Sequence, residues 1–250
     1  MNSLGFNKKE NDTKVIVAMS GGVDSSVAAV KLKMEGYDVT GVTLRLYNQP
    51  NSSKSKSCCA GIDIDDAKKV AEQYDFPHKI FDYQDKFFNG VISNFVDSYA
   101  NGETPVPCIQ CNQTVKFSDL LEESKNLNAD ALVTGHYAIR KGGLKESKLF
   151  KAKDKTKDQS YFLFATLQDQ LDYVRFPLGN YLKSEIRQMA NDYNLVVSDK
   201  PVSQDICFVT SDSYRDLINK IKPDINIEGN IFDINGNKIG LHKGIANYTV

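Results

Sequence analysis

The sequence predicts an α/β fold in which a parallel sheet carries helices on both faces, and three observations support this prediction. Over the first two-thirds of the chain, short apolar runs typical of strands alternate with longer stretches in which apolar residues recur at helical spacing. A Gly-Gly turn in the segment "SGGVDS" lies directly between the first such strand and the first such helix. After about Gln159 the alternation ends, and a small, mainly helical region is followed from Ile225 by a β pattern.

Each element has its own signal. Four apolar runs are typical of strands and cover residues 14–19, 39–46, 78–82 and 131–134. The first helix has one apolar stripe, formed by Val23, Val27, Val30 and Met34. Apolar helical faces follow at 67–74, 88–99 and 117–127, and later helices are expected at 161–167 and 183–193. Because ligands of such folds bind at the carboxyl ends of the strands, we expect the SGGVDS turn at that edge of the sheet.

Three regions are expected along the chain. Residues 1–158 form the α/β domain with the SGGVDS turn, residues 159–224 form a mainly helical region, and residues 225–250 begin a β domain that this chain does not complete. The last region has Asn235-Gly236 between two apolar runs, which is a strong hairpin signal. The polar stretch 51–57 predicts a loop.

Composition and charge are those of an ordinary globular protein and exclude a generally basic nucleic-acid binder. Charged residues make up 25% of the chain, hydrophobic residues 41%, and the net charge is −1. The amino-terminal segment is polar and no apolar run approaches the roughly 18 residues of a membrane helix, so we expect a cytoplasmic protein with reduced cysteines.

One segment departs from this charge balance. Arg140 and seven lysines between positions 141 and 157 give the window 140–158 a net charge of +5. Such a patch can hold a phosphate backbone while the rest of the protein stays acidic. Taken alone, the patch is more simply interpreted as a solvated lysine-rich loop.

The SGGVDS turn has the elements of a phosphate-binding loop but lacks the lysine of the P-loop pattern GxxxxGK[ST]. Gly21 and Gly22 allow a tight turn that brings backbone N–H groups close to an anion. The serines of the turn add hydroxyl donors, and the helix that starts near Asp24 directs its positive end to the same point. Such a loop suits ATP that loses its β- and γ-phosphates together, with Mg²⁺ sharing the charge, so that AMP passes to a substrate.

The complete pattern of residues 20–25 resembles the signature SGGxDS of the PP-loop ATP pyrophosphatase superfamily. Four more segments narrow the resemblance: "PVPCIQCNQTVKF", "VTGHY", "KDQSYFL" and "SQDICFV". With them the chain is similar, from about Lys14 to its end, to the bacterial tRNA-specific 2-thiouridylases. The resemblance implies a transferase that thiolates the wobble uridine of tRNA with ATP and a sulfur-relay donor protein. Because the family pattern continues into a C-terminal β-barrel, we expect this chain to be truncated before that barrel.

The chemistry of thiolation suits two cysteines that are distant in sequence. Adenylylation of the uridine carbonyl oxygen turns it into AMP, which is a good leaving group. A cysteine persulfide then supplies sulfur, and a second cysteine resolves the reaction by forming a disulfide. By resemblance, Cys207 carries the persulfide and Cys111 is the nucleophile or resolving thiol. We expect a helix start close to Cys111 to lower the pKa of its thiol.

The resemblance also implies the binding residues. Those of the ATP site are Ala18, Met19, Ser20, Gly21, Gly22, Val23, Asp24, Ser25, Leu44 and Gly135. Those that contact tRNA are Val106, Pro107, Cys108, His136, Lys157, Asp158 and Gln159, so the region after 158 is expected to contact tRNA as well. Cys108 stands where many relatives have an aspartate three residues before the first catalytic cysteine. The acid/base role of that carboxylate must then be filled by another group or by the Cys108 thiolate.

Three other functions stay open at this point. A PP-loop amidotransferase or ligase would adenylylate a small molecule and would need neither tRNA nor paired cysteines. An iron–sulfur-dependent tRNA thiolase would hold its cluster with Cys108, Cys111 and Cys207. A nucleotide-binding module without catalysis is less consistent with the complete SGGVDS pattern. Cys58 and Cys59 are adjacent rather than spaced as CxxC, and we expect them to be loop or half-buried thiols without a role.

Overall fold

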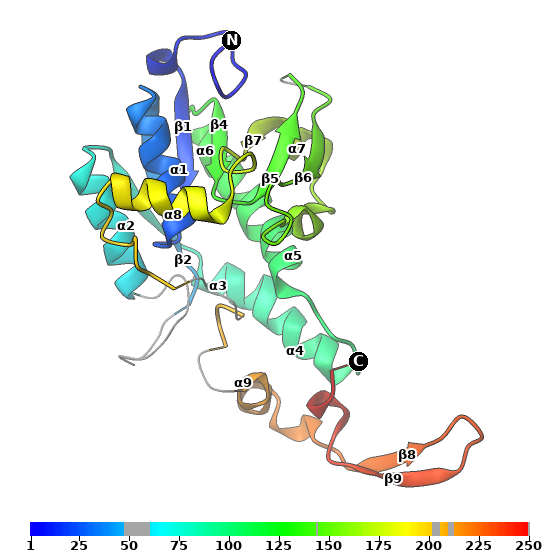
Figure 1. Ribbon diagram of the computed structural model, residues 1–250. Helices are drawn as coiled ribbons and strands as arrows, with labels where there is room; N and C mark the ends of the chain where they lie inside the picture. The colour runs from blue at the N-terminus through cyan, green and yellow to red at the C-terminus, as the bar shows by residue number, and fades with distance from the viewer. Residues whose placement is uncertain (48–60, 144, 202–205, 210–212, 250) are drawn as a thin grey trace.

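The computed structural model describes residues 1–47, 61–143, 145–201, 206–209 and 213–249, and its centre is a five-stranded parallel sheet in the order β3-β2-β1-β4-β7 (Figure 1). The strands are β1 (Lys14–Ala18), β2 (Asp38–Arg45), β3 (His78–Asp82), β4 (Ala131–Thr134) and β7 (Val174–Arg175). The α/β fold and the four strands expected from the sequence are confirmed, with bounds within one residue. The fifth strand was missed because only two residues form it.

The strand order places a topological switch point beside β1. From β1 the chain moves outward to β2 and β3, and it then returns to add β4 on the other side of β1. At such a point the loops that follow the two central strands turn in opposite directions and leave a crevice between them. The segments that follow β1 and β4, which contain residues 20–25 and Gly135, therefore meet at the carboxyl edge of the sheet.

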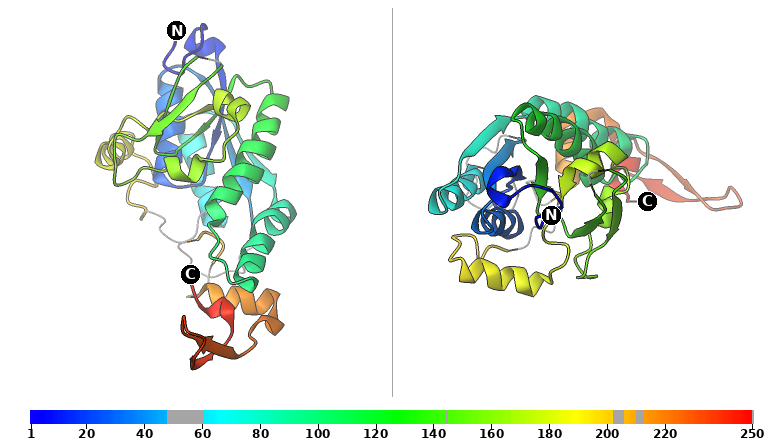
Figure 2. Two further views of the ribbon diagram at one scale, coloured as in Figure 1. Left: turned by 90° about the vertical axis from the view of Figure 1, so that its right-hand side faces the viewer. Right: turned by 90° about the horizontal axis from the view of Figure 1, so that it is seen from above.

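The two faces of the sheet pack against different helices. Val15 and Val17 belong to one hydrophobic cluster, the first-face core, with α1 (Val23–Met34), α2 (Gly61–Gln73) and α8 (Lys183–Asp192). Ile16 belongs to another, the second-face core, because alternate residues of a strand point to opposite faces. Figures 1 and 2 show α1 and α8 on one side of the sheet and the helices from α3 to α6 on the other.

The second face is covered by two interrupted helical rods. The first consists of α3 (Gln84–Phe87), η2 (Phe88–Ile92) and α4 (Ser93–Ala100), and the second of α5 (Pro107–Cys111), η3 (Asn112–Asp119) and α6 (Leu120–Asn126). Both middle segments are π-helical, with wider turns than an α-helix. Such insertions are often found at functional sites, and η3 begins directly after Cys111.

The α/β layer continues past residue 158. Leu178, Ile186 and Ala190 are fully buried in the first-face core, and β7 completes the sheet. The helix expected at 161–167 is not formed: a short 3-10 helix, η4 (Ser160–Leu163), precedes α7 (Gln168–Tyr173). The lysine-rich segment forms an antiparallel pair that the sequence did not predict, β5 (Ala138–Lys141) and β6 (Lys148–Lys151).

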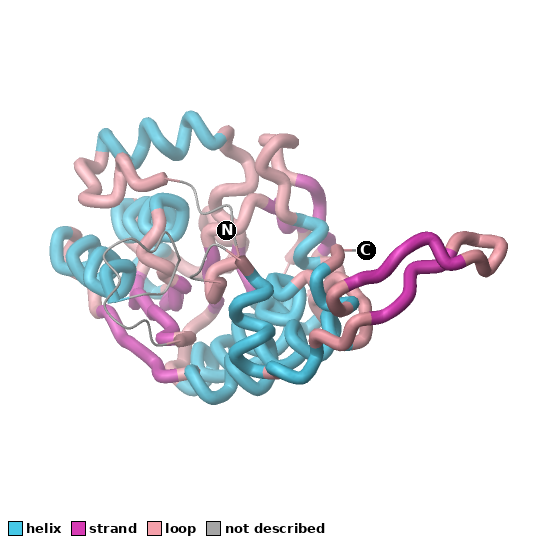
Figure 3. Tube along the Cα trace, turned by 90° about the horizontal axis from the view of Figure 1, so that it is seen from below, coloured by secondary structure: helices cyan, strands magenta, loops and turns pink. Residues whose placement is uncertain are grey.

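The carboxyl-terminal part extends away from the sheet (Figures 1 and 3). It consists of α9 (Tyr214–Ile221), η5 (Pro223–Ile225), β8 (Gly229–Phe232), β9 (Lys238–His242) and η6 (Ile245–Asn247). The hairpin expected around Asn235-Gly236 is confirmed. This part contacts α4 through a ring stack of Tyr99 on Tyr214, with centroids 4.5 Å apart, and through an ion pair between Lys222 and Asp97.

The amino-terminal segment adds one 3-10 turn, η1 (Glu10–Asp12). In the described part of the chain, no helix has the length and apolar character that crossing a membrane requires. The loop expected at 51–57 and the adjacent Cys58 and Cys59 lie outside the described residues.

Candidate active site

The PP-loop, residues 20–25, follows β1 at the switch point and depends on its glycines. Gly21 has a φ of +70°, and a Cβ at this position would lie 2.0 Å from the Asp63 carbonyl oxygen. No other residue fits there, because both the backbone angle and the backbone of α2 exclude a side chain. Gly22 is the N-cap of α1 and has no side chain to satisfy the first N–H groups of the helix. These donors are therefore suited to an anion.

The loop is closed from within and touched by the end of β4. The Ser25 hydroxyl accepts a hydrogen bond from the Ser20 amide (3.1 Å) and donates one to the Gly22 carbonyl (3.3 Å). A Cβ on Gly135 would lie 2.9 Å from the Ser25 nitrogen and 3.0 Å from the Asp24 carbonyl carbon. Glycine at position 135 thus lets two segments that are 110 residues apart in sequence meet at backbone distance.

Asp24 is the acidic side chain of the loop and has two partners from distant segments. The Tyr137 hydroxyl donates a hydrogen bond to Asp24 Oδ1 (2.7 Å), and Lys183 Nζ lies 2.5 Å from the same oxygen. Burial, together with the negative charge of Asp24, raises the pKa of Tyr137, so its hydroxyl keeps its proton and acts as a donor. Tyr137 follows His136 in the segment after β4, and Lys183 opens α8.

A second lysine supports the loop from behind. Lys200 Nζ donates to the Gly21 carbonyl (2.9 Å), to Asp66 Oδ2 (2.8 Å) and to Asp63 Oδ1. Burial alone would lower the pKa of Lys200, but the hydrogen bonds to the two carboxylates outweigh it and raise the pKa. All three N–H groups of this ammonium are occupied, so Lys200 fixes the position of Gly21.

These features fit a nucleotide triphosphate. The expected ATP residues 18–25 and Gly135 share one edge, and Leu44 lies next to them near the carboxyl end of β2, where it is buried in the second-face core. Backbone donors at a helix start bind phosphate oxygens, and a buried apolar side chain on the next strand suits an adenine ring.

Cys108 and Cys111 lie one helical turn apart and in different surroundings. The helix begins at Pro107, after the N-cap Val106, so Cys108 is in its first turn and exposed. Cys111 is 7% exposed, and the helix continues past it into η3. The expectation that a helix start lowers the pKa of Cys111 is wrong. Burial raises that pKa, and Lys116 opposes the effect only in part.

Cys207 lies against the same layer of helices. Its neighbour Phe208 packs edge-on against Phe87 and Phe95, with ring centroids 5.7 and 5.2 Å apart. Cys111 is part of the second-face core and the half-buried Cys207 packs against that core. None of Cys108, Cys111 and Cys207 forms a disulfide in this structure.

A metal cluster gains no support from this arrangement. Within the described residues, which include Cys108, Cys111 and Cys207, no group of three or more His, Cys, Asp or Glu side chains is placed to hold a metal ion. The geometry therefore does not favour the iron–sulfur alternative.

His136 is a neutral imidazole in this fold. Its ring lies between Phe117 and Phe176, each with a centroid 6.1 Å away, and its Nδ1 is 2.8 Å from the Thr134 hydroxyl. Burial lowers the pKa of His136 to about 3, with a smaller effect of Lys116 in the same direction. A contact between His136 and tRNA would thus be a hydrogen bond of a neutral ring rather than an ion pair with phosphate.

The Lys157-Asp158-Gln159 segment uses two of its three side chains inside the protein. Asp158 Oδ1 accepts from the Ala152 amide (2.8 Å), and Gln159 Oε1 accepts from the Tyr137 amide (3.0 Å). The Gln159 backbone N–H also donates a hydrogen bond to the Tyr137 carbonyl (2.8 Å). Gln159 therefore holds the residue whose hydroxyl contacts Asp24 of the PP-loop.

The lysine-rich segment is a charged hairpin, and the Arg140 side chain binds the backbone after it. The Arg140 guanidinium donates to the Leu171 carbonyl (2.8 Å) and the Asp172 carbonyl (3.0 Å), so it caps backbone instead of facing solvent. Lys141 and Lys148 are exposed and directly opposite each other in the β5–β6 register. Like charges in that position weaken strand pairing in a hairpin.

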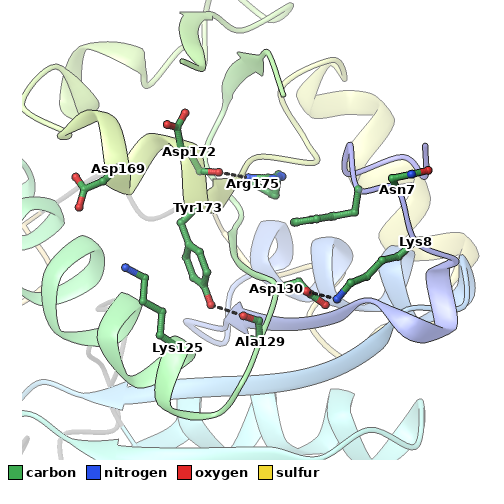
Figure 4. A pocket seen from close by; sticks show the side chains of 10 residues that line it. Asn7, Lys8, Lys125, Ala129, Asp130, Asp169, Asp172, Tyr173 and Arg175 are labelled. Carbon is green, nitrogen blue, oxygen red and sulfur yellow. Dashed lines mark hydrogen bonds and ion pairs between the residues drawn. The ribbon is translucent and has the colours of Figure 1, made fainter. Parts of the chain in front are cut away.

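A cavity away from the PP-loop lies at the opposite edge of the sheet. The edge pocket has a volume of about 540 Å³ and is lined by residues that precede β4 and surround β7 (Figure 4). Three of its charged groups are already engaged, since Lys8 pairs with Asp130 at 2.5 Å and Arg175 donates to backbone carbonyls. We assign no part of the reaction to this pocket.

Sequence reasoning missed Tyr137, Lys183 and Lys200 as neighbours of the PP-loop. One signal was available: Lys183 begins an expected helix, where a cation opposes the helix dipole and needs a compensating partner. Tyr137 and Lys200 gave no such signal, because only the return of the chain from β4 and from α8 brings them to the loop.

Comparisons with known proteins identify the family of the chain. The family model described as tRNA methyl transferase HUP domain matches residues 13–211. A curated tRNA-specific 2-thiouridylase MnmA of Dinoroseobacter shibae is 52% identical over 252 residues, and that of Jannaschia sp. is 53% identical over 252 residues. Each alignment covers 100% of this chain and 66% of the relative, so the chain spans about two-thirds of the length of these relatives.

A solved structure shares the fold. The crystal structure of a 4-thiouridine synthetase–RNA complex with bound ATP matches with a TM-score of 0.53 and 16% identity, over 85% of this chain and 51% of that chain. At this identity the match supports the architecture alone. Because the family model covers most of the chain and the curated relatives are more than half identical to it, the chain belongs to the tRNA methyl transferase HUP domain family, as a relative of the tRNA-specific 2-thiouridylases.

Proposed function

We propose that this chain carries out ATP-dependent 2-thiolation of the wobble uridine of tRNA, as a tRNA-uridine 2-sulfurtransferase. The observation that carries the proposal is the joint placement of two parts in one fold. A complete PP-loop occupies the switch point of the sheet, the Cys111 thiol belongs to the helical layer on its second face, and Cys207 packs against that layer. A protein that only bound a nucleotide would not need the two cysteines.

The PP-loop edge would hold ATP through the backbone donors of residues 20–25, with Leu44 and Gly135 at the sides of the nucleotide. When bound, ATP supplies an AMP group that makes the uridine oxygen a good leaving group. Asp24 is the carboxylate of the loop and would be the protein ligand of a Mg²⁺ ion that shares the phosphate charge.

The cysteine pair would deliver the sulfur. Cys207 accepts a persulfide from a sulfur-relay donor protein, and the terminal sulfur bonds to C2 of the uridine as AMP departs. The Cys111 thiolate then attacks the Cys207 sulfur, the S–S bond to the new thiouridine breaks, and a Cys111–Cys207 disulfide remains. A thiol reductant restores both cysteines. Burial raises the pKa of Cys111, so the attack on Cys207 requires removal of the proton from the Cys111 thiol.

The tRNA would be held by the hairpin lysines and by the segment after it. Lys141, Lys148 and Lys151 are exposed on β5 and β6. Tyr161 and Phe164, which follow the Lys-Asp-Gln segment, are 58% and 72% exposed. Exposed aromatic rings beside a cationic surface are suited to stacking on unpaired bases. A cytoplasmic location, as expected from the sequence, is part of this proposal.

The test is a reaction of the purified chain with ATP, bulk tRNA, inorganic polysulfide as a source of persulfide-level sulfur and a thiol reductant, with a parallel reaction that lacks tRNA. We expect AMP and pyrophosphate in equal amounts, tRNA dependence of both, and 2-thiouridine in nuclease digests analysed by mass spectrometry. Stoichiometric ADP would contradict the nucleotide chemistry. Equal turnover without tRNA would favour a ligase or amidotransferase acting on a small molecule.

A further inference from the structure

Lys183 is a lysine of the candidate ATP site that no sequence motif marks. It opens α8, and its ammonium reaches across to the PP-loop, where Nζ lies 2.5 Å from Asp24 Oδ1. The side chain is 13% exposed, and its Nζ lies 5.7 Å from the centre of the Tyr137 ring. The loop that lacks a P-loop lysine therefore has one beside it, supplied from 159 residues further along the chain.

The backbone of Lys183 is held in place by hydrogen bonds, whereas its ammonium can exchange Asp24 for another acceptor. The Lys183 amide donates to Asp154 Oδ2 (2.9 Å), and the neighbouring Leu182 amide donates to Glu185 Oε2 (2.5 Å). These bonds position the first turn of α8. The ammonium sits on a flexible four-carbon stem, so it can change its acceptor without moving the helix.

Lys183 differs in this respect from Lys200. The Lys200 ammonium is saturated by the Gly21 carbonyl and by Asp63 and Asp66. Within the described residues, Asp24 is the hydrogen-bond acceptor of the Lys183 ammonium, which leaves it N–H groups for a second anion. Two lysines thus flank the loop, one committed to its shape and one available to a ligand.

We propose that Lys183 is the phosphate-binding cation of this nucleotide site and replaces the lysine that the loop lacks. In the free protein its charge is balanced by Asp24. When ATP binds, the ammonium turns from the Asp24 carboxylate to phosphate oxygens, and Asp24 is released toward the metal ion that accompanies ATP. The inference rests on the proposed use of ATP, and it adds the group that neutralises the triphosphate at the moment of binding.

The test compares Lys183→Met with Lys31→Met in binding titrations with ATP and with adenosine, in the presence and absence of Mg²⁺. Lys31 is a matched control, because it is 16% exposed and pairs with the Glu35 carboxylate on α1. We expect Lys183→Met to weaken ATP binding by about 10- to 100-fold, as for the loss of a charge-assisted hydrogen bond, and to change adenosine binding by less than about twofold. Lys31→Met should leave both affinities unchanged, and Lys183→Arg should keep part of the ATP affinity.

A structural role of the Lys183–Asp24 pair is distinguished by a double variant. If Lys183 acts only by holding Asp24, Lys183→Met will have no further effect in an Asp24→Asn background, whereas a phosphate contact will still be lost there. Equal losses of ATP and adenosine, or no effect in the Asp24→Asn background, would overturn the inference. If the wild-type chain bound no ATP while it stayed folded, the proposed function would fail first and this inference with it.

Discussion

The PP-loop and the helix that begins at Pro107 serve one proposed reaction but are built in opposite ways. Around the loop, charge is already arranged: Lys200 holds Gly21, and Tyr137 and Lys183 both contact Asp24. Around Cys111 burial dominates, since the thiol lies in the second-face core and burial raises its pKa although Lys116 opposes the effect. In the proposed reaction, the nucleotide half would bind ATP with its charges already in place, while the Cys111 thiol of the sulfur half would have to be deprotonated.

The different surroundings of the loop and of the thiol suit their different proposed tasks. A loop that binds a highly charged ligand gains from donors that are in place beforehand, because little reorganisation is then needed. An ionised thiol is instead open to oxidation and to reaction with the wrong electrophile. Keeping Cys111 protonated until the activated uridine is present limits those losses. The exposed Cys108, one turn earlier, does not have this protection.

The largest expected effect is the loss of thiolation with ATP binding retained. Cys111→Ser and Cys207→Ser should each abolish thiolation of tRNA, because removal of a nucleophile leaves no alternative route. ATP affinity should stay within about twofold of wild type, because substitutions at sites without shared partners act independently. Nucleoside mass spectrometry and ATP titration give the two readouts. Cys108→Ser is the matched control and should slow thiolation without stopping it. Full activity of Cys111→Ser would assign its role to another residue.

The pH dependence of alkylation measures the protection of Cys111. The thiolate is the reactive form, and a raised pKa means that less of it is present at any pH below that value. At about pH 7.5 we expect iodoacetamide to modify Cys108 at least about tenfold faster than Cys111. Modification of Cys111 should keep rising with pH beyond its ordinary pKa of 9.0. Peptide mass spectrometry separates the sites, and denatured protein, in which the two rates should converge, is the control. A plateau for Cys111 below about pH 8 would contradict the raised pKa.

Much of the nucleotide half could be predicted from the sequence, because its signals are local. The four expected strands and the SGGVDS turn depend on short apolar runs and on glycines whose conformations are set by neighbouring residues. The short strand β7 could not be predicted, since Val174 and Arg175 pair with β4 only through the tertiary arrangement. The lysine hairpin was hidden by its composition, which is typical of a solvated loop.

The burial and the pKa of the Cys111 thiol could not be predicted from the sequence, because they depend on where the helix begins and on tertiary packing. The sequence shows that a helix runs near Cys111, but the pKa depends on whether the thiol is in the first turn or one turn further in. Here the helix begins at Pro107, so the position close to the helix start is that of Cys108. Cys111, one turn further in, is buried, and burial raises its pKa.

The smallest expected effect concerns the β5–β6 hairpin, which contributes to neither half directly. Lys141 and Lys148 face each other across the hairpin, and each like-charge pair of this kind weakens the strand pairing. Lys141→Gln with Lys148→Gln should reduce the slope of tRNA affinity against salt by about 1.5 to 2, one phosphate contact for each lysine removed. Filter binding at several salt concentrations gives that slope, and Lys68→Gln on α2, where Lys68 pairs with Glu72, is the control.

The same double variant should melt at an equal or higher temperature than wild type, because the repulsion is gone. Loss of tRNA affinity together with a gain in stability is the result expected of a binding surface. A gain in stability with an unchanged salt slope would show that the hairpin is only a solvated edge of the fold.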